Sequence, residues 1–66
     1  MQIFINDHAV NCNEGQTLSE ILTDNGIIPE HIAIAVDNTI VPKQQWVTTV
    51  IRDGSRILII KAVQGG

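Results

Sequence analysis

Apolar and polar residues alternate at the start of the chain, over residues 1–6. Met1, Ile3 and Ile5 fall on one face of an extended segment, because successive side chains of a strand point to opposite sides. Polar turn residues follow at 6–8, and a second short apolar stretch occupies residues 9–12. The chain is therefore predicted to begin with a β-hairpin.

A helix is predicted next, because the apolar spacing changes from two residues to three and four. The residues at this spacing are Leu18, Ile21 and Leu22. Thr17 and Glu20 form a capping-box pattern, and Gly26 can take the left-handed conformation that ends a helix. A helix of about two turns does not persist alone, so its apolar stripe must pack on a sheet.

The second half of the chain predicts a second hairpin and two further turns before a final strand. Residues 32–36 and 39–41 flank an Asp37-Asn38 turn, which predicts a second hairpin ended by Pro42. Residues 43–46 are expected to form a single turn, and Gly54 suits the left-handed position of the turn at 52–55.

The last strand is predicted over residues 56–63 and is apolar on both faces from Ile57 to Ile60. This pattern places it centrally, beside and parallel to the first strand and under the helix. We expect an α+β fold in which a small mixed sheet packs on one short helix. The domain should span residues 1–63, with a flexible diglycine tail at 64–66.

Composition limits the partners of this domain. The chain has 66 residues, 44% of them apolar, and a net charge of −3 with only four Lys and Arg, which argues against binding a nucleic-acid backbone. No apolar run approaches the roughly 18 residues that span a membrane. A single cysteine, Cys12, and an N-terminus without an export pattern lead us to expect a cytoplasmic protein, monomeric when free.

The diglycine Gly65-Gly66 stands directly after the most apolar strand of the sequence. Glycine has no side chain, so the reactive group at this end is the α-carboxylate of Gly66. Gly65 and Gly66 can also thread a narrow slot, because residues without Cβ reach conformations that are closed to others. These residues are the candidate reactive site, although a glycine-rich chain end is also common without any function.

The order of these elements, together with several local motifs, is similar to a known family over the whole chain. The residues that carry the similarity are Met1-Gln2-Ile3 with Asn6 and Asp7, Gly15-Gln16-Thr17, Ala33-Ile34-Ala35-Val36 with Asp37-Asn38, Ile40-Val41-Pro42 with Gln45-Trp46, Asp53-Gly54, and Gly65-Gly66. The chain resembles the bacterial sulfur carriers of the ubiquitin-like β-grasp type (ThiS/MoaD-like), most closely those of the thiamine pathway.

This resemblance implies a chemical role for Gly66. A carboxylate resists nucleophiles, so an E1-like adenylyltransferase (ThiF-like) would use ATP to convert it to an acyl adenylate. A persulfide-bearing sulfur donor protein would then attack, and reduction would leave a thiocarboxylate that gives its sulfur to thiazole synthase (ThiG-like). The chain itself would bind no cofactor or metal and would be a protein co-substrate rather than an enzyme, since it lacks a phosphate-binding loop and a nucleophile–base set.

A docking surface is predicted on the last strand. If Leu58, Ile60 and Ala62 face the helix, the alternate residues form an apolar patch on the opposite side of the sheet, and such patches usually mark interfaces. Lys61 would lie at its margin, and the tail from Gln64 onward would enter the partner. The predicted partner-binding residues are Ile57, Ile59, Lys61, Val63 and Gln64.

Other chemically interesting residues favour structural roles. Cys12 could carry a persulfide, but it lies where a half-buried apolar residue is expected, and no basic residue or second cysteine is near it in sequence. His8 and His31 lack a ligand motif and are expected on the surface. Trp46 could anchor an interface, but in a chain with one other aromatic residue we favour a core position below the loop after Pro42.

Three other interpretations of the chain remain open. The small subunit of molybdopterin synthase shares the fold and the tail, and a ubiquitin-like modifier would join Gly66 to lysines through the same adenylate. A β-grasp module that only binds proteins would use no tail chemistry at all.

Overall fold

The computed structural model describes residues 1–61, so the predicted boundary between residues 63 and 64 lies outside the described part. The strands and helices are β1 (Gln2–Ile5), β2 (His8–Asn11), α1 (Leu18–Asp24), β3 (Ile32–Val36), β4 (Thr39–Ile40), the 3-10 turn η1 (Lys43–Gln45) and β5 (Arg56–Lys61). Each of the predicted elements is present, with shifts of one or two residues at the ends that the structure describes, and the predicted end of the last strand at residue 63 lies outside the described residues.

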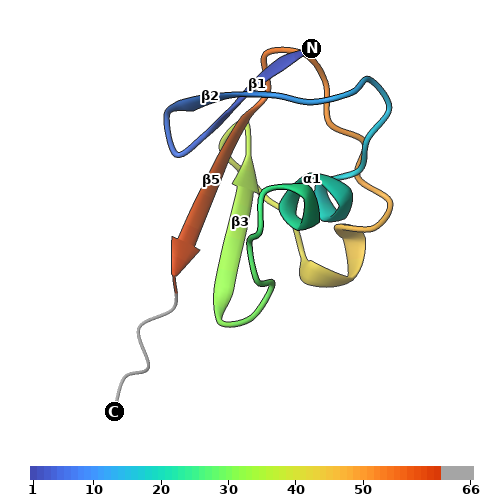
Figure 1. Ribbon diagram of the computed structural model, residues 1–66. Coiled ribbons are helices and arrows are strands. Elements are labelled where there is room, and N and C mark those ends of the chain that lie inside the picture. The colour runs from blue at the N-terminus through green and yellow to red at the C-terminus, as the bar shows by residue number, and fades with distance from the viewer. Residues whose placement is uncertain (62–66) are drawn as a thin grey trace.

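The strands form one mixed sheet in the order β2-β1-β5-β3-β4. β1 and β5 are parallel, and the other neighbouring strands are antiparallel. Figure 1 shows α1 lying against one side of this sheet. The prediction that the last strand is central and parallel to the first is therefore confirmed.

Both hairpins turn through two residues with positive φ. The first loop has φ 48° at Asn6 and 68° at Asp7, and the second has 48° at Asp37 and 70° at Asn38. Such turns match the right-handed twist of the paired strands, and Asn and Asp tolerate this conformation better than other side chains do. The turns therefore fix the register of both hairpins.

The capping box holds the first turn of α1. The Glu20 amide donates to Thr17 Oγ1 at 3.2 Å, and the Thr17 amide donates to Glu20 Oε1 at 2.9 Å. Gly26 has φ +69° beyond the other end of the helix, as the sequence predicted. Leu18, Ile21 and Leu22 are all buried, so the whole apolar stripe of α1 packs on the sheet.

One core cluster joins the helix, the inner face of the sheet and the loop after β4. Its buried members are Ile3, Ile5, Leu18, Ile21, Leu22, Ile34, Trp46, Ile51 and Ile57. Trp46 is only 4% exposed, and its Nε1 donates to the Val41 carbonyl at 2.8 Å. This partner satisfies the indole N–H in the interior, so the interpretation of Trp46 as a core residue is confirmed.

The prediction of which side of β5 faces the helix was wrong. Ile57 is 2% exposed and belongs to the core, and Ile59 is half-buried against it, whereas Leu58 and Ile60 are exposed on the opposite face. The reason is the pairing of β5 with β1: Ile57 lies opposite Ile5, and residues that face each other across two strands point to the same side. Because Ile5 points into the core, Ile57 must do so as well.

Candidate functional site

The candidate site is the end of β5, from which the diglycine tail departs. The predicted reactive residues, Gly65 and Gly66, and the predicted partner-binding residues Val63 and Gln64 lie outside the described residues. The structure describes the strand that leads to them as far as Lys61. In Figure 1 this end of β5 points away from the N-terminus.

β5 is held along both of its edges. On one side it pairs with β3 over its last five residues, as far as Ile32 opposite Lys61. On the other side, the amide of Asn6 donates to the Ile57 carbonyl at 2.9 Å. β1 has ended at this point, and the side chain of Asn6 takes its place: Asn6 Oδ1 accepts from the Ile59 amide at 2.8 Å. The direction of the strand is therefore fixed through Lys61.

An apolar patch lies on the sheet face turned away from α1. Leu58 lies opposite Ala35, which in turn lies opposite Ile40, so these side chains share one face. Ile60 follows on the same face. The exposed fractions are 50% for Leu58, 43% for Ile60 and 59% for Ile40. We call the surface formed by these three residues and the half-buried Phe4 on β1 the outer patch.

One arginine borders the outer patch. Arg56 lies opposite Phe4 in the parallel pair, and its guanidinium carbon is 5.1 Å from the centre of the Phe4 ring. The same side chain approaches Asp7 at 3.7 Å, but both side chains are mostly exposed, so this ion pair adds little stability. The two contacts instead hold the positive charge of Arg56 at the margin of the patch.

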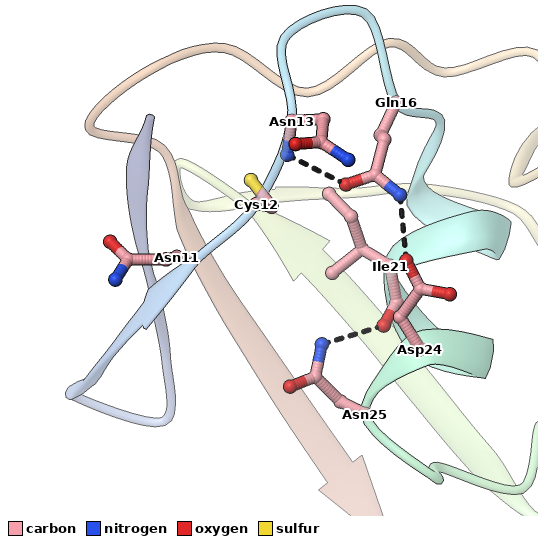
Figure 2. Close-up of a pocket in the computed structure, with 7 residues that line it drawn as sticks. All are labelled: Asn11, Cys12, Asn13, Gln16, Ile21, Asp24 and Asn25. Carbon is pink, nitrogen blue, oxygen red and sulfur yellow. Dashed lines mark hydrogen bonds between the residues drawn. The ribbon is translucent and has the colours of Figure 1, made fainter.

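Cys12 lies just after β2 and is half-buried against the core, rather than inside a strand as predicted. Figure 2 shows it in a polar pocket together with Gln16 and Asp24, whose side chains are joined by a hydrogen bond of 2.7 Å from Gln16 Nε2 to Asp24 Oδ2. None of the described residues that line this pocket is basic. The pocket therefore places no basic side chain beside the thiol, and the nearby N-terminal ammonium of Met1 donates to the Cys12 carbonyl at 2.8 Å.

The remaining candidate residues form no second functional site within the part of the chain that is described. His8 and His31 are exposed, as expected. Within residues 1–61, no three His, Cys, Asp or Glu side chains come together as a metal site would require. No helix in the same range is long and apolar enough to cross a membrane.

Comparison with known proteins places this geometry in a family. The family model that describes the ThiS family matches residues 3–66. The chain belongs to the ThiS family. The sulfur carrier protein ThiS of Escherichia coli (strain K12) is 38% identical over 66 residues, which covers all of both chains. An uncharacterized protein of Porphyra purpurea, ycf40, is 33% identical over 66 residues, covering all of this chain and 93% of its own.

Solved structures of the ThiS family share the fold. The crystal structure of a thiamine biosynthesis protein (ThiS) from Geobacter metallireducens has a TM-score of 0.88 at 16% identity and is covered, like this chain, over its full length. A solution NMR structure of a thiamine biosynthesis protein from the same organism has a TM-score of 0.75 at 17% identity, covering all of this chain and 88% of that one. The predicted α+β, ubiquitin-like β-grasp fold is thus confirmed.

Two features of the site were missed by reasoning from sequence. The outer patch was assigned to the wrong residues because Arg56 and Lys61 fall on opposite faces of β5, so the charges of this strand indicate no preferred side. The role of Asn6 was missed because its bond to Ile59 joins positions 53 residues apart. Ile5 could have indicated the correct side of β5, because its place in the N-terminal alternation identifies the inner face of the sheet.

Proposed function

We propose that this chain is a sulfur carrier of thiamine biosynthesis and that the α-carboxylate of Gly66 is the group that carries sulfur. The observation that supports this most strongly is the 38% identity to the sulfur carrier of Escherichia coli across the full length of both chains. The chain acts as a protein co-substrate of thiamine-biosynthesis enzymes and not as a catalyst.

The proposed chemistry begins with activation of a poor electrophile. A carboxylate oxygen of Gly66 attacks the α-phosphate of ATP on an adenylating partner, and pyrophosphate leaves. The terminal sulfur of a persulfide on a donor protein then attacks the acyl carbon and displaces AMP. A thiol reduces the resulting acyl disulfide, so that a thiocarboxylate remains on Gly66 and the thiol's sulfur is oxidised. ATP is bound by the partner, and this chain holds no cofactor of its own.

The contribution of the chain is to present the tail in a fixed direction. The hydrogen bonds from β3 and from Asn6 hold β5 as far as Lys61. The five residues beyond it reach at most about 17 Å when extended. An enzyme that acts on Gly66 must therefore bring its surface close to the end of β5.

The outer patch suits this docking. Exposed Ile60 lies next to the end of β5, and Leu58 and Ile40 continue the same face toward β4. Clustered apolar side chains on a small domain usually mark an interface. We assign to this surface both the adenylyltransferase, which is ThiF-like, and the thiazole synthase, which is ThiG-like. The patch takes the place of the predicted set that contained Ile57 and Ile59.

Carrier-dependent exchange of pyrophosphate into ATP tests the proposal. The parent chain should support exchange by the adenylating enzyme, and a chain lacking Gly66 should fold normally and support none. Normal exchange without Gly66 would contradict the assignment. Accumulation of isopeptide-linked conjugates on lysines, with no thiocarboxylate, would identify a ubiquitin-like modifier instead.

A further inference from the structure

The short helix leaves part of the inner sheet face uncovered. α1 has only seven residues and is about 10 Å long. Leu18, Ile21 and Leu22 cover the first part of β5, where Ile57 is buried. No helix covers the inner face near the end of β5, where Ile59 is only half-buried.

A groove of about 680 Å³ occupies this uncovered region. We call it the tail groove. Its apolar walls consist of Ile5, Ile27, Ile28, Ile32 and Ile59, and Lys61 lies at its open end. Ile27, Ile32 and Ile59 pack against the core and form a firm wall. Ile28 is 70% exposed, which makes it the most exposed large apolar side chain of residues 1–61.

Ile28 is held over the groove by the loop between α1 and β3. The amide of Ile27 donates to the Leu22 carbonyl at 2.9 Å, directly after Gly26 with its φ of +69°. This bond ties the loop to the end of α1, while Ile27 packs inward. Ile28 therefore stands on a fixed support at the rim, which costs little conformational freedom when a partner covers it.

The location of the groove indicates what fills it. Lys61 is both a groove residue and the last described residue before the tail. Because five extended residues reach only about 17 Å, the slot that receives them must open close to Lys61. The outer patch lies on one side of this point and the tail groove on the other, so an enzyme surrounding the tail contacts both.

The chemistry of the groove favours an apolar occupant. Five isoleucines line the groove together with the polar Asn6 and His31, and Glu30 and Lys61 at its rim have opposite charges, so the rim does not select a charged group. Contact from two sides would also prevent the domain from tilting against the enzyme, and an error of about 1 Å in the position of a reacting group can cost a hundredfold in rate.

We infer that the tail groove receives an apolar side chain from the edge of the tail-binding slot of the adenylating enzyme. The inference rests on the proposed function. It adds a second contact, on the sheet face opposite the outer patch, with Ile28 at its centre.

The test compares Ile28→Ser with Val47→Ser in carrier-dependent pyrophosphate exchange. Val47 is 64% exposed and follows η1, which lies beyond α1 from β5 in Figure 1. Ile28→Ser should raise the KM for the carrier about tenfold, the size expected for a contact worth about 1.4 kcal/mol, with kcat little changed. Val47→Ser should titrate like the parent, and Ile28→Val, which keeps a branched apolar side chain, should regain most of the affinity.

The outcomes separate the groove from the proposed function. If the parent supports exchange and Ile28→Ser titrates identically while folded by circular dichroism, the groove assignment is wrong and the function stands. The same holds if Ile28→Ser impairs only sulfur donation to thiazole synthase. If the parent itself supports no exchange, the proposed function fails and the groove assignment fails with it.

Discussion

Two neighbouring residues of β5 carry side chains of equal size and meet opposite surroundings. Ile57 is 2% exposed beneath α1, whereas Leu58 is 50% exposed on the face that no helix covers. The difference arises from strand pairing, since both residues are apolar and equally suited to the interior. It shows that one strand supplies the core with one face and a docking surface with the other.

The largest effect should come from removing the inner side chain. Ile57→Ala is expected to lower the free energy of unfolding by about 3 kcal/mol, because it deletes three buried carbon atoms and leaves a cavity. A small domain has only a few kcal/mol in total, so much of this variant should be unfolded. Leu58→Ala should change stability by about 0.5 kcal/mol or less in the same urea titration. Equal losses at the two positions would contradict the assigned sides.

A charge on the outer face should separate docking from folding. Leu58→Asp is expected to weaken binding to the adenylating enzyme by about tenfold to a hundredfold, because it places a carboxylate inside an apolar contact. Its thermal unfolding should remain close to that of the parent. Titration calorimetry measures the affinity, with Val47→Asp as the matched control at an exposed apolar residue outside the patch. Unchanged binding of the folded Leu58→Asp variant would remove the outer patch from the account.

The support of β5 by Asn6 should have an intermediate effect. Asn6→Gly removes the acceptor of the Ile59 amide but keeps a residue that tolerates φ 48°. We expect a loss of about 1 kcal/mol in unfolding free energy. Hydrogen exchange should accelerate at the Ile59 amide more than at other amides of β5. Asn6→Asp retains an acceptor oxygen and should protect that amide, and uniform acceleration in both variants would indicate only global destabilisation.

Cys12→Ser should have the smallest effect. The thiol is half-buried beside the core and outside both apolar surfaces of β5, so its replacement by a hydroxyl should cost less than about 1 kcal/mol. Sulfur loading by a complete set of partner enzymes should be unchanged. Loss of the thiocarboxylate in a folded Cys12→Ser chain would instead support a persulfide on this residue.

Local patterns predicted the elements of this fold well. The capping box of Thr17 and Glu20, the turn at Asp37-Asn38 and the left-handed Gly54 each depend on a few consecutive residues, and the structure confirms all three. The central position of β5 also followed, because a run of apolar residues on both faces requires cover or a partner.

The orientation of β5 could not be predicted from its own residues. It is decided by the pairing of Ile57 with Ile5, across some fifty residues of chain, and a shift by one position reverses every side chain. The tail groove is lined by residues of β1, β3, β5 and the loop after α1, and no local motif records that these segments meet. The exposure of Ile28 could not be predicted either, because the adjacent Ile27 is the same residue type and yet packs toward the core.

Whether Gly66 carries sulfur is decided by intact-mass analysis of the chain recovered from cells. We expect a species in which one oxygen is replaced by sulfur, with fragmentation placing the change on the last residue. This species should disappear when Gly66 is deleted and persist in Cys12→Ser. A sulfur adduct found on Cys12, or no thiocarboxylate species in cells that are making thiamine, would show that Gly66 is not the carrier.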